Sequence, residues 1–153
     1  KHLMKFFLFL ILNFAALAIG GLFTGSGVSS DWYNNLNKAP WTPPGWVFGF
    51  AWTLIMILFT FYMANAVTLT KNPKALVFIF AIQWILNVIW NPVFFYFNNA
   101  LLGLVVISAL TILIAFIFIR YWPDLKMKSF FILPYFLWLI IATSLNAYIF
   151  LKN

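Results

Sequence analysis

Long apolar runs separated by short polar or proline-containing intervals make up most of this sequence. Five runs are predicted to be helices, near residues 3–24, 44–69, 75–97, 100–122 and 129–151. At 1.5 Å per residue each reaches roughly 30 Å, enough to cross the hydrocarbon core of a bilayer. Membrane-spanning strands would require alternating apolar and polar residues, which these runs lack. The pattern therefore predicts an all-α membrane protein, a five-transmembrane-helix bundle formed by a single domain of residues 1–153.

The first run has a second interpretation as a secretory signal peptide, because Lys1 and Lys5 accompany the start of an apolar stretch. Typical signal peptides contain an apolar region of only about 7–15 residues, however, and this run is longer. We therefore expect residues 3–24 to form the first spanning helix.

The interval between the first two runs contains an external loop, residues 25–43, that is rich in tryptophan and proline. Pro40 and Pro43 in this loop and Pro44 directly after it each fix a backbone φ angle and stiffen the stretch. Thr42-Pro43 predicts a helix start. A Thr hydroxyl can accept a hydrogen bond from a free backbone N–H, and Pro at the first helical position loses no hydrogen bond. A loop this rigid and aromatic is predicted to form a lid or wall over the helices.

Composition agrees with the membrane class and excludes several kinds of chemistry. The chain is 65% hydrophobic and 7% charged, against about 25% charged residues in soluble domains. It contains no cysteine, and its single histidine is His2 at the terminus. Disulfides, iron–sulfur clusters and histidine-based metal sites are therefore excluded, and we predict no metal and no cofactor.

A net charge of +7 raises the question of nucleic-acid binding, but the basic residues are scattered over loops and form no stripe. In the predicted topology they separate by side instead. One side carries Lys1, Lys5, Lys71, Lys74, Arg120, Lys126 and Lys128, and the other carries Lys38 and Lys152. By the positive-inside rule this distribution predicts a cytoplasmic N-terminus and an external loop 25–43.

Prolines and glycines inside the runs predict local features of packing. Pro92 and Pro134 fall within the third and fifth runs, and each is expected to produce a kink. The pairs Gly21/Gly25 and Gly45/Gly49 have the spacing that allows helices to approach closely, and the first pair is a candidate dimer face.

Two polar or mixed stripes carry the candidate binding residues. Gln83, Asn87 and Asn91 lie at i, i+4 and i+8, so they share one face, which must point into the bundle because amides in hydrocarbon need partners. This face could serve interhelical hydrogen bonding or a ligand, and the third run alone does not choose between them. In the fifth run one face consists of Tyr135, Trp138, Ala142, Leu145 and Asn146. The small Ala142 leaves either a packing notch or room for a flat ligand.

The two stripes are predicted to lie at similar depths in the membrane. Counted from the external end of each run, Trp52, Trp90, Asn87 and Ala142 lie about 10–15 Å deep, and Trp138 lies about 20 Å deep. We therefore predict one cavity in the external half of the bundle, with aromatic and amide walls suited to a large apolar ligand. Its predicted roof consists of Trp32, Tyr33 and Pro43.

No acidic or basic residue lies in the middle of any run, which argues against ion-coupled transport. Carboxylate pairs and Ser/His/Asp sets are also missing. An enzyme is therefore the less favoured interpretation, and any reaction would depend on the ligand's own reactivity, with tryptophan as its redox or photochemical partner.

The chain resembles the TspO/MBR family of translocator or peripheral-type benzodiazepine-receptor proteins. The matching positions are Trp32-Tyr33, Leu36, Lys38, Pro40-Trp41-Thr42-Pro43-Pro44, Val47-Phe48-Gly49, Trp52, Gln83, Asn87, Trp90, Phe94-Phe95, Pro134-Tyr135, Trp138, Ala142 and Leu145-Asn146. They extend over nearly the whole chain in the family's order and spacing. One departure is Met56, where many members have tyrosine, so this chain lacks the phenol that those members have there.

This resemblance implies a five-helix membrane protein, often a homodimer, that binds porphyrins and, in animal members, cholesterol and isoquinoline carboxamides. By position, the implied cavity residues are Tyr33, Pro43, Trp52, Asn87, Trp90, Asn91, Trp138, Ala142 and Leu145. Trp52 and Trp138 match the tryptophans linked to porphyrin breakdown. Leu145, Tyr148 and Lys152 also fit a proposed sterol motif, although that pattern is weak and its Tyr and Lys are common at any span end.

The sequence thus predicts a membrane receptor for porphyrin-type tetrapyrroles, with a role in their transport or in stress regulation. The first alternative is a light- and oxygen-dependent porphyrin-degrading enzyme that uses Trp52 and Trp138. The second alternative is a passive translocator of sterols or porphyrins.

Overall fold

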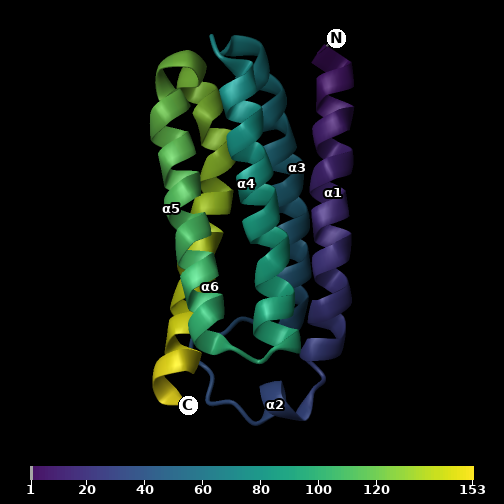
Figure 1. The fold of residues 1–153 in the computed structure, drawn as a ribbon, viewed down its shortest axis with the longest axis vertical. Coiled ribbons are helices and arrows are strands. Elements are labelled where there is room, and N and C mark those ends of the chain that lie inside the picture. The colour runs from purple at the N-terminus through teal and green to yellow at the C-terminus, as the bar shows by residue number, and fades with distance from the viewer. Residues whose placement is uncertain (1) are drawn as a thin grey trace.

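The structure is a computed structural model that describes residues 2–153, in which long helices run side by side along one axis (Figure 1). Within those residues the regular secondary structure is helical and no strand is present. The elements in chain order are α1 (His2–Gly27), α2 (Asp31–Asn34), α3 (Gly45–Leu69), α4 (Pro73–Asn91), η1 (Pro92–Tyr96), α5 (Ala100–Leu125), η2 (Lys126–Ile132) and α6 (Leu133–Lys152).

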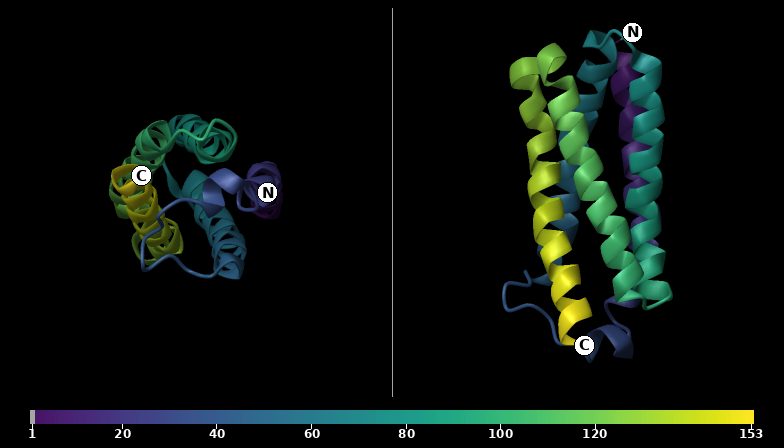
Figure 2. Two further views of the ribbon diagram at one scale, coloured as in Figure 1. Left: turned by 90° about the horizontal axis from the view of Figure 1, so that it is seen from below. Right: turned by 60° about the vertical axis from the view of Figure 1, so that its left-hand side comes forward.

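Four helical segments in this described range are long and apolar enough to cross a membrane: His2–Gly27, Gly45–Leu69, Pro73–Tyr96 and Ala100–Lys152. The last segment contains two of the predicted runs, because α5, η2 and α6 follow one another without a break in helical structure. The chain nevertheless reverses direction there, so that α5 and α6 pack side by side (Figures 1 and 2). All-helical architecture is confirmed, whereas the number of membrane crossings stays a prediction.

The reversal between α5 and α6 differs from the expected loop. α5 continues past the predicted end at residue 122 and includes Pro123 in its last turn, where the missing N–H removes only one hydrogen bond. Lys126 then takes a left-handed φ of 52°, and the 3₁₀ turns of η2 lead into α6. Pro134 lies in the first turn of α6, where proline costs no helical hydrogen bond. The prediction that Pro134 kinks the interior of a helix is therefore wrong.

Pro92 changes the helix type at the end of α4. The α-helix gives way to one π-helical turn, η1, in which the Phe97 N–H donates to the Pro92 carbonyl at 2.9 Å. A π turn contains an extra residue and re-aims the side chains that follow it. Here those side chains include Phe94 and Phe95, which line the cavity described below.

The predicted helix start at Thr42-Pro43 is also wrong. α3 begins at Gly45, and the Thr42 hydroxyl donates backwards to the Ala39 carbonyl at 2.7 Å instead of accepting a helical N–H. The three prolines and this backward hydrogen bond keep the chain non-helical until Pro44, which shortens α3 and leaves residues 35–44 as an extended strap beneath the bundle (Figure 1).

The two ends of the bundle differ in charge, as predicted. The start of α1, the α3–α4 link and the α5–η2 junction lie at one end, and these segments carry Lys5, Lys71, Lys74, Arg120, Lys126 and Lys128 (Figure 1). The strap that contains Lys38 and the end of α6 that contains Lys152 lie at the opposite end. Lys1 lies outside the described residues. Which end faces the cytoplasm stays a prediction.

Close helix contacts occur at other glycines than those in the spaced pairs. At Gly21, Gly25, Gly45 and Gly49 an added Cβ would meet no atom within 4 Å, so none of these four supports a contact inside this chain. Gly20, Gly27 and Gly103 do lie against other elements, where a Cβ would meet Asn91, Phe95 and Asn146 respectively.

Candidate functional site

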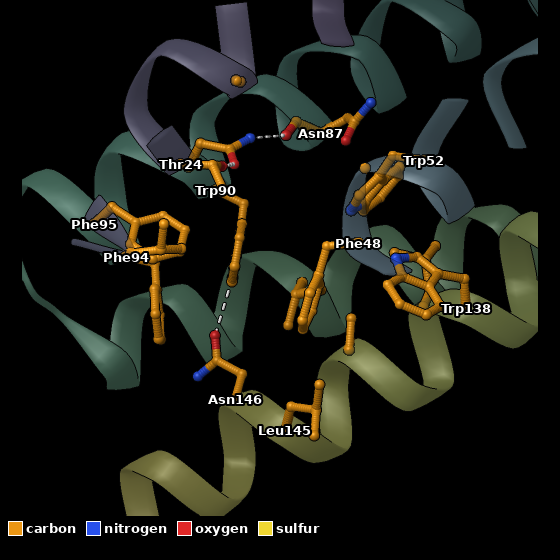
Figure 3. Close-up of a pocket in the computed structure, with 18 of the residues that line it drawn as sticks. Thr24, Phe48, Trp52, Asn87, Trp90, Phe94, Phe95, Trp138, Leu145 and Asn146 are labelled. Carbon is orange, nitrogen blue, oxygen red and sulfur yellow. Dashed lines mark hydrogen bonds between the residues drawn. The ribbon is translucent and has the colours of Figure 1, made fainter. Parts of the chain in front are cut away.

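A cavity of about 660 Å³ occupies the strap end of the bundle, within the range of about 300–1,000 Å³ typical of small-molecule sites. α1, α3, α4, η1, α5 and α6 all contribute to its wall, and the strap contributes Lys38, Thr42 and Pro43. Figure 3 shows Trp90 on one side of this space and Phe48, Trp52 and Trp138 on the other. The helices therefore surround a hollow at this end rather than packing tightly.

The structure brings together every predicted cavity residue except one. The residues that line the cavity include Tyr33, Pro43, Trp52, Asn87, Trp90, Asn91, Trp138, Ala142 and Leu145. Trp32, predicted as part of the roof, lies outside it and packs against Phe94, with ring centroids 5.3 Å apart. Trp32 therefore supports the wall from behind and does not face the hollow.

The loop between α1 and α3 lies at the mouth of the cavity and is held there by contacts on two sides. Next to the Trp32–Phe94 contact, Tyr33 packs on Phe95 with ring centroids 5.6 Å apart. At its other side the strap is tied to α6: Asn37 exchanges hydrogen bonds with Asn153, one of them at 2.8 Å, and the Trp41 indole N–H donates to the Ser144 hydroxyl at 3.0 Å. These contacts hold the loop against both walls of the opening.

Trp52 and Trp138 meet at the deep side of the hollow. Their ring centroids are 6.5 Å apart with the rings nearly perpendicular, and Phe48 packs on Trp138 at 5.6 Å. The Trp138 indole nitrogen is buried and finds no hydrogen-bond partner within the described part of the chain. The two tryptophans therefore form one aromatic corner of the wall.

Of the three amide side chains in the stripe of α4, two form hydrogen bonds with other side chains or the backbone and one does not. Gln83 is buried and accepts a hydrogen bond from the Tyr135 hydroxyl at 2.8 Å. Asn91 accepts from the Thr24 hydroxyl at 2.8 Å and donates to the Asn87 carbonyl. The Asn87 side chain lines the cavity, and none of the hydrogen bonds found in residues 2–153 uses its amide. Interhelical hydrogen bonding is therefore confirmed for Gln83 and Asn91, whereas a ligand-facing role of Asn87 stays a prediction.

The buried Asn146 side chain links three helices at the cavity wall. Asn146 accepts a hydrogen bond from the Trp90 indole N–H at 3.0 Å and donates to the Ala100 carbonyl at 2.8 Å (Figure 3). It thereby ties α6 to α4 and to the start of α5. Gly103 permits this bridge, because its missing Cβ would lie 3.0 Å from the Asn146 oxygen.

Replacing Asn146 with leucine, Asn146→Leu, is expected to lower the free energy of unfolding by about 1–2 kcal/mol. The two interhelical contacts are each worth about 0.6 kcal/mol on average in membrane proteins, and the partly buried Trp90 N–H would lose its acceptor. Denaturation in detergent micelles measures the change. Asn65→Leu is the matched control, because the Asn65 amide bonds only within its own helix, to the Phe61 carbonyl. Equal stability of the two variants would contradict the bridging role.

Several wall residues had no signal in the sequence. α1 contributes Ala16, Leu17, Gly20 and Thr24, although its apolar pattern marks no special face. Lys38 and Phe48 also line the hollow. Both belong to the stretch that resembles a family motif, which was the only available indication of their place.

Met56, the departure from the family pattern, lies at the wall of the cavity. Its side chain is almost fully buried and reaches the cavity wall, while its carbonyl accepts hydrogen bonds from Thr60 at 2.7 Å and from Asn13 at 3.4 Å. A thioether at this point can make apolar contacts but cannot donate a hydrogen bond to a ligand.

The residues of the sterol motif do not gather at one place. Leu145 lines the cavity, whereas Tyr148 packs on Trp41 with ring centroids 5.6 Å apart. Lys152 ends α6, and its backbone carbonyl accepts a hydrogen bond from the Asn37 side-chain amide.

Among residues 2–153, no group of three or more His, Cys, Asp or Glu side chains is placed so that it could hold a metal ion.

Comparison with known proteins gives a consistent result. The family model described as the TspO/MBR family matches residues 8–151. The chain is 33% identical over 138 residues to a tryptophan-rich sensory protein of Cereibacter sphaeroides, which covers 90% of this chain and 87% of the relative. It is 38% identical over 146 residues to the tryptophan-rich protein TspO of Archaeoglobus fulgidus, covering 91% and 92% of the two chains. A translocator protein homolog of Schizosaccharomyces pombe is 28% identical over 74% of this chain and 73% of its own length.

Proposed function

This chain belongs to the TspO/MBR family of membrane proteins, and on that premise we propose that it binds porphyrin-type tetrapyrroles and similar large, flat, apolar ligands. One observation carries the proposal: a cavity of about 660 Å³ whose wall is mostly aromatic and aliphatic. Such walls bind ligands mainly by burying apolar area, while a few polar groups fix orientation. A role in tetrapyrrole transport or stress regulation would follow from such binding.

The binding site depends on a membrane arrangement that we also propose. α5 and α6 would cross separately, because η2 turns the chain back between them, and this gives five crossings. The basic end would then face the cytoplasm and the strap would be external. A homodimer, which the family resemblance implies, remains part of the proposal.

Tryptophan fluorescence tests the site directly. In the double variant Trp52→Phe/Trp138→Phe we expect protoporphyrin IX to bind about tenfold more weakly or worse, because each lost indole contact is worth about 0.5–1.5 kcal/mol. Titration of each protein with protoporphyrin, followed by emission quenching, measures both amplitude and affinity.

The matched control is Trp46→Phe/Trp122→Phe, which removes two tryptophans outside the cavity. This control is expected to keep the wild-type affinity. If protoporphyrin quenches the tryptophan emission of the Trp52→Phe/Trp138→Phe variant with the same affinity and amplitude as in the wild type, the proposed site is wrong.

A second candidate function is light- and oxygen-dependent breakdown of the bound porphyrin. The contact between Trp52 and Trp138 favours it, because two adjacent indoles beside an excited ligand could exchange electrons with it. Illumination of the complex in air should then consume porphyrin faster than a protein-free detergent control does. Equal rates with and without protein would leave binding as the only function of the site.

A further inference from the structure

We propose that Lys38 pairs with a carboxylate on the ligand, so that the cavity selects flat apolar molecules with an acidic edge and holds that edge toward the strap. The inference rests on the proposed function and deepens it. It names the chemical class of ligand, an amphiphilic aromatic carboxylate, and the residue that recognises it.

Lys38 is the one acidic or basic side chain among the described residues that line the cavity. Its ammonium nitrogen lies 4.5 Å from the centroid of the Tyr33 ring, and both side chains are partly buried. Neither acid of the chain lines the cavity: Asp31 is the exposed first residue of α2, two residues before Tyr33, and Asp124 is in the last turn of α5 at the opposite end of the bundle. The cavity therefore has one fixed positive charge, at the mouth.

The Tyr33 ring positions this charge without neutralising it. A cation above an aromatic face is attracted by the ring's quadrupole, and the ammonium keeps N–H donors free on its other sides. A tyrosine phenol is neutral at physiological pH, and burial raises the pKa of Tyr33 further above its ordinary value. The contact thus orders the lysine side chain while leaving its charge available for a ligand anion.

An anion has no comparable partner deeper in the cavity. Away from the strap the wall consists of aromatic rings, aliphatic side chains and uncharged polar groups, namely Thr24 and the amides of Asn87, Asn91 and Asn146. Burying a carboxylate among them would cost much of its hydration energy. Beside Lys38 the same group gains a charge-assisted hydrogen bond in a partly screened site. A ligand with an acidic edge is therefore held in one orientation, with its apolar body against Trp52 and Trp138.

Esterification of the ligand tests this pairing, because it removes the negative charge and keeps the ring system. Protoporphyrin IX and its dimethyl ester would be titrated against the protein in uncharged phosphatidylcholine nanodiscs, using tryptophan quenching. The wild type is expected to bind the free acid about tenfold more tightly than the diester. In Lys38→Met the affinity for the free acid should fall to that for the diester, while the affinity for the diester should not change. Lys38→Arg, which keeps the positive charge, should retain most of the preference for the acid.

Lys71→Met is the charge-matched control, because it removes one positive charge from the exposed α3–α4 link, far from the cavity. It should keep the tenfold preference. Equal binding of acid and diester by the wild type, or a preference that persists in Lys38→Met, would overturn the pairing while leaving porphyrin binding intact. Failure of both probes to bind any of these proteins would instead overturn the proposed function itself.

Discussion

Filling the hollow at Ala142, in Ala142→Phe, is expected to weaken protoporphyrin IX binding by about thirtyfold without unfolding the bundle. Ala142 lines the cavity on α6 beside Trp138 and Leu145, and its small side chain leaves space that a ligand would use. A phenyl ring there would displace ligand contacts of similar area, worth about 2 kcal/mol, and each 1.4 kcal/mol changes affinity tenfold. Titration by tryptophan quenching measures the loss.

The control for this variant is Ala109→Phe, because Ala109 is exposed on the outer face of α5 and does not line the cavity. It adds the same ring where lipid can accommodate it, so its affinity should equal that of the wild type. Unchanged binding by Ala142→Phe would mean that the ligand occupies another place. A loss of helical content in that variant, measured by circular dichroism, would show that the space is not empty in the folded state.

Adding one methyl group to Gly27, in Gly27→Ala, is expected to lower the free energy of unfolding by about 3 kcal/mol, the upper end for overpacked positions. A Cβ at Gly27 would overlap the Phe95 ring and would lie 2.6 Å from its Cβ. Phe95 cannot easily move aside, because Trp90, Phe94 and Tyr33 all pack against it. Thermal unfolding in detergent measures the effect.

Gly25→Ala provides a close control for this variant. Gly25 lies in the same helix with no atom within 4 Å of a Cβ, so alanine there should be neutral or slightly stabilising through its better helix propensity. If both variants unfold at the same temperature, α1 does not press on η1 as described. Because Phe95 also lines the cavity and supports Tyr33, Gly27→Ala should weaken ligand binding as well.

These two predictions address different properties of the same region. Ala142 tests whether the hollow holds the ligand, and Gly27 tests whether the aromatic contacts of η1 fix the position of the lid. The bracing of the loop by Trp32 and Tyr33 on Phe94 and Phe95 makes the second property a condition for the first.

Helix positions could be predicted well where long apolar runs meet simple stops. The second run, predicted at 44–69, corresponds to α3 at Gly45–Leu69, and the fifth ends within a residue of α6. Proline was less informative, because its effect depends on its place in the helix. Pro134 starts α6, Pro123 lies inside the last turn of α5, and Pro92 introduces a π turn.

Side-chain partners could not be predicted from spacing. Periodicity placed Gln83, Asn87 and Asn91 on one face, but only the packing of α1 and α6 against α4 shows that Tyr135 and Thr24 bond to the first and the third. Trp32 and Tyr33 are neighbours in sequence, yet one packs behind the wall and the other faces the hollow. Local sequence contains no information on which helix will lie opposite a given side chain.

The sequence by itself determined the membrane class, the helical character, the separation of basic residues between two ends, and the family, because hydropathy, charge and motif spacing are local properties of the chain. Only the tertiary structure decided that α1 helps to form the wall, that Asn87 keeps a free amide, and that Lys38 stands over Tyr33 at the mouth of the cavity. Those features arise from contacts between residues far apart in sequence, and such contacts exist only after the helices have packed.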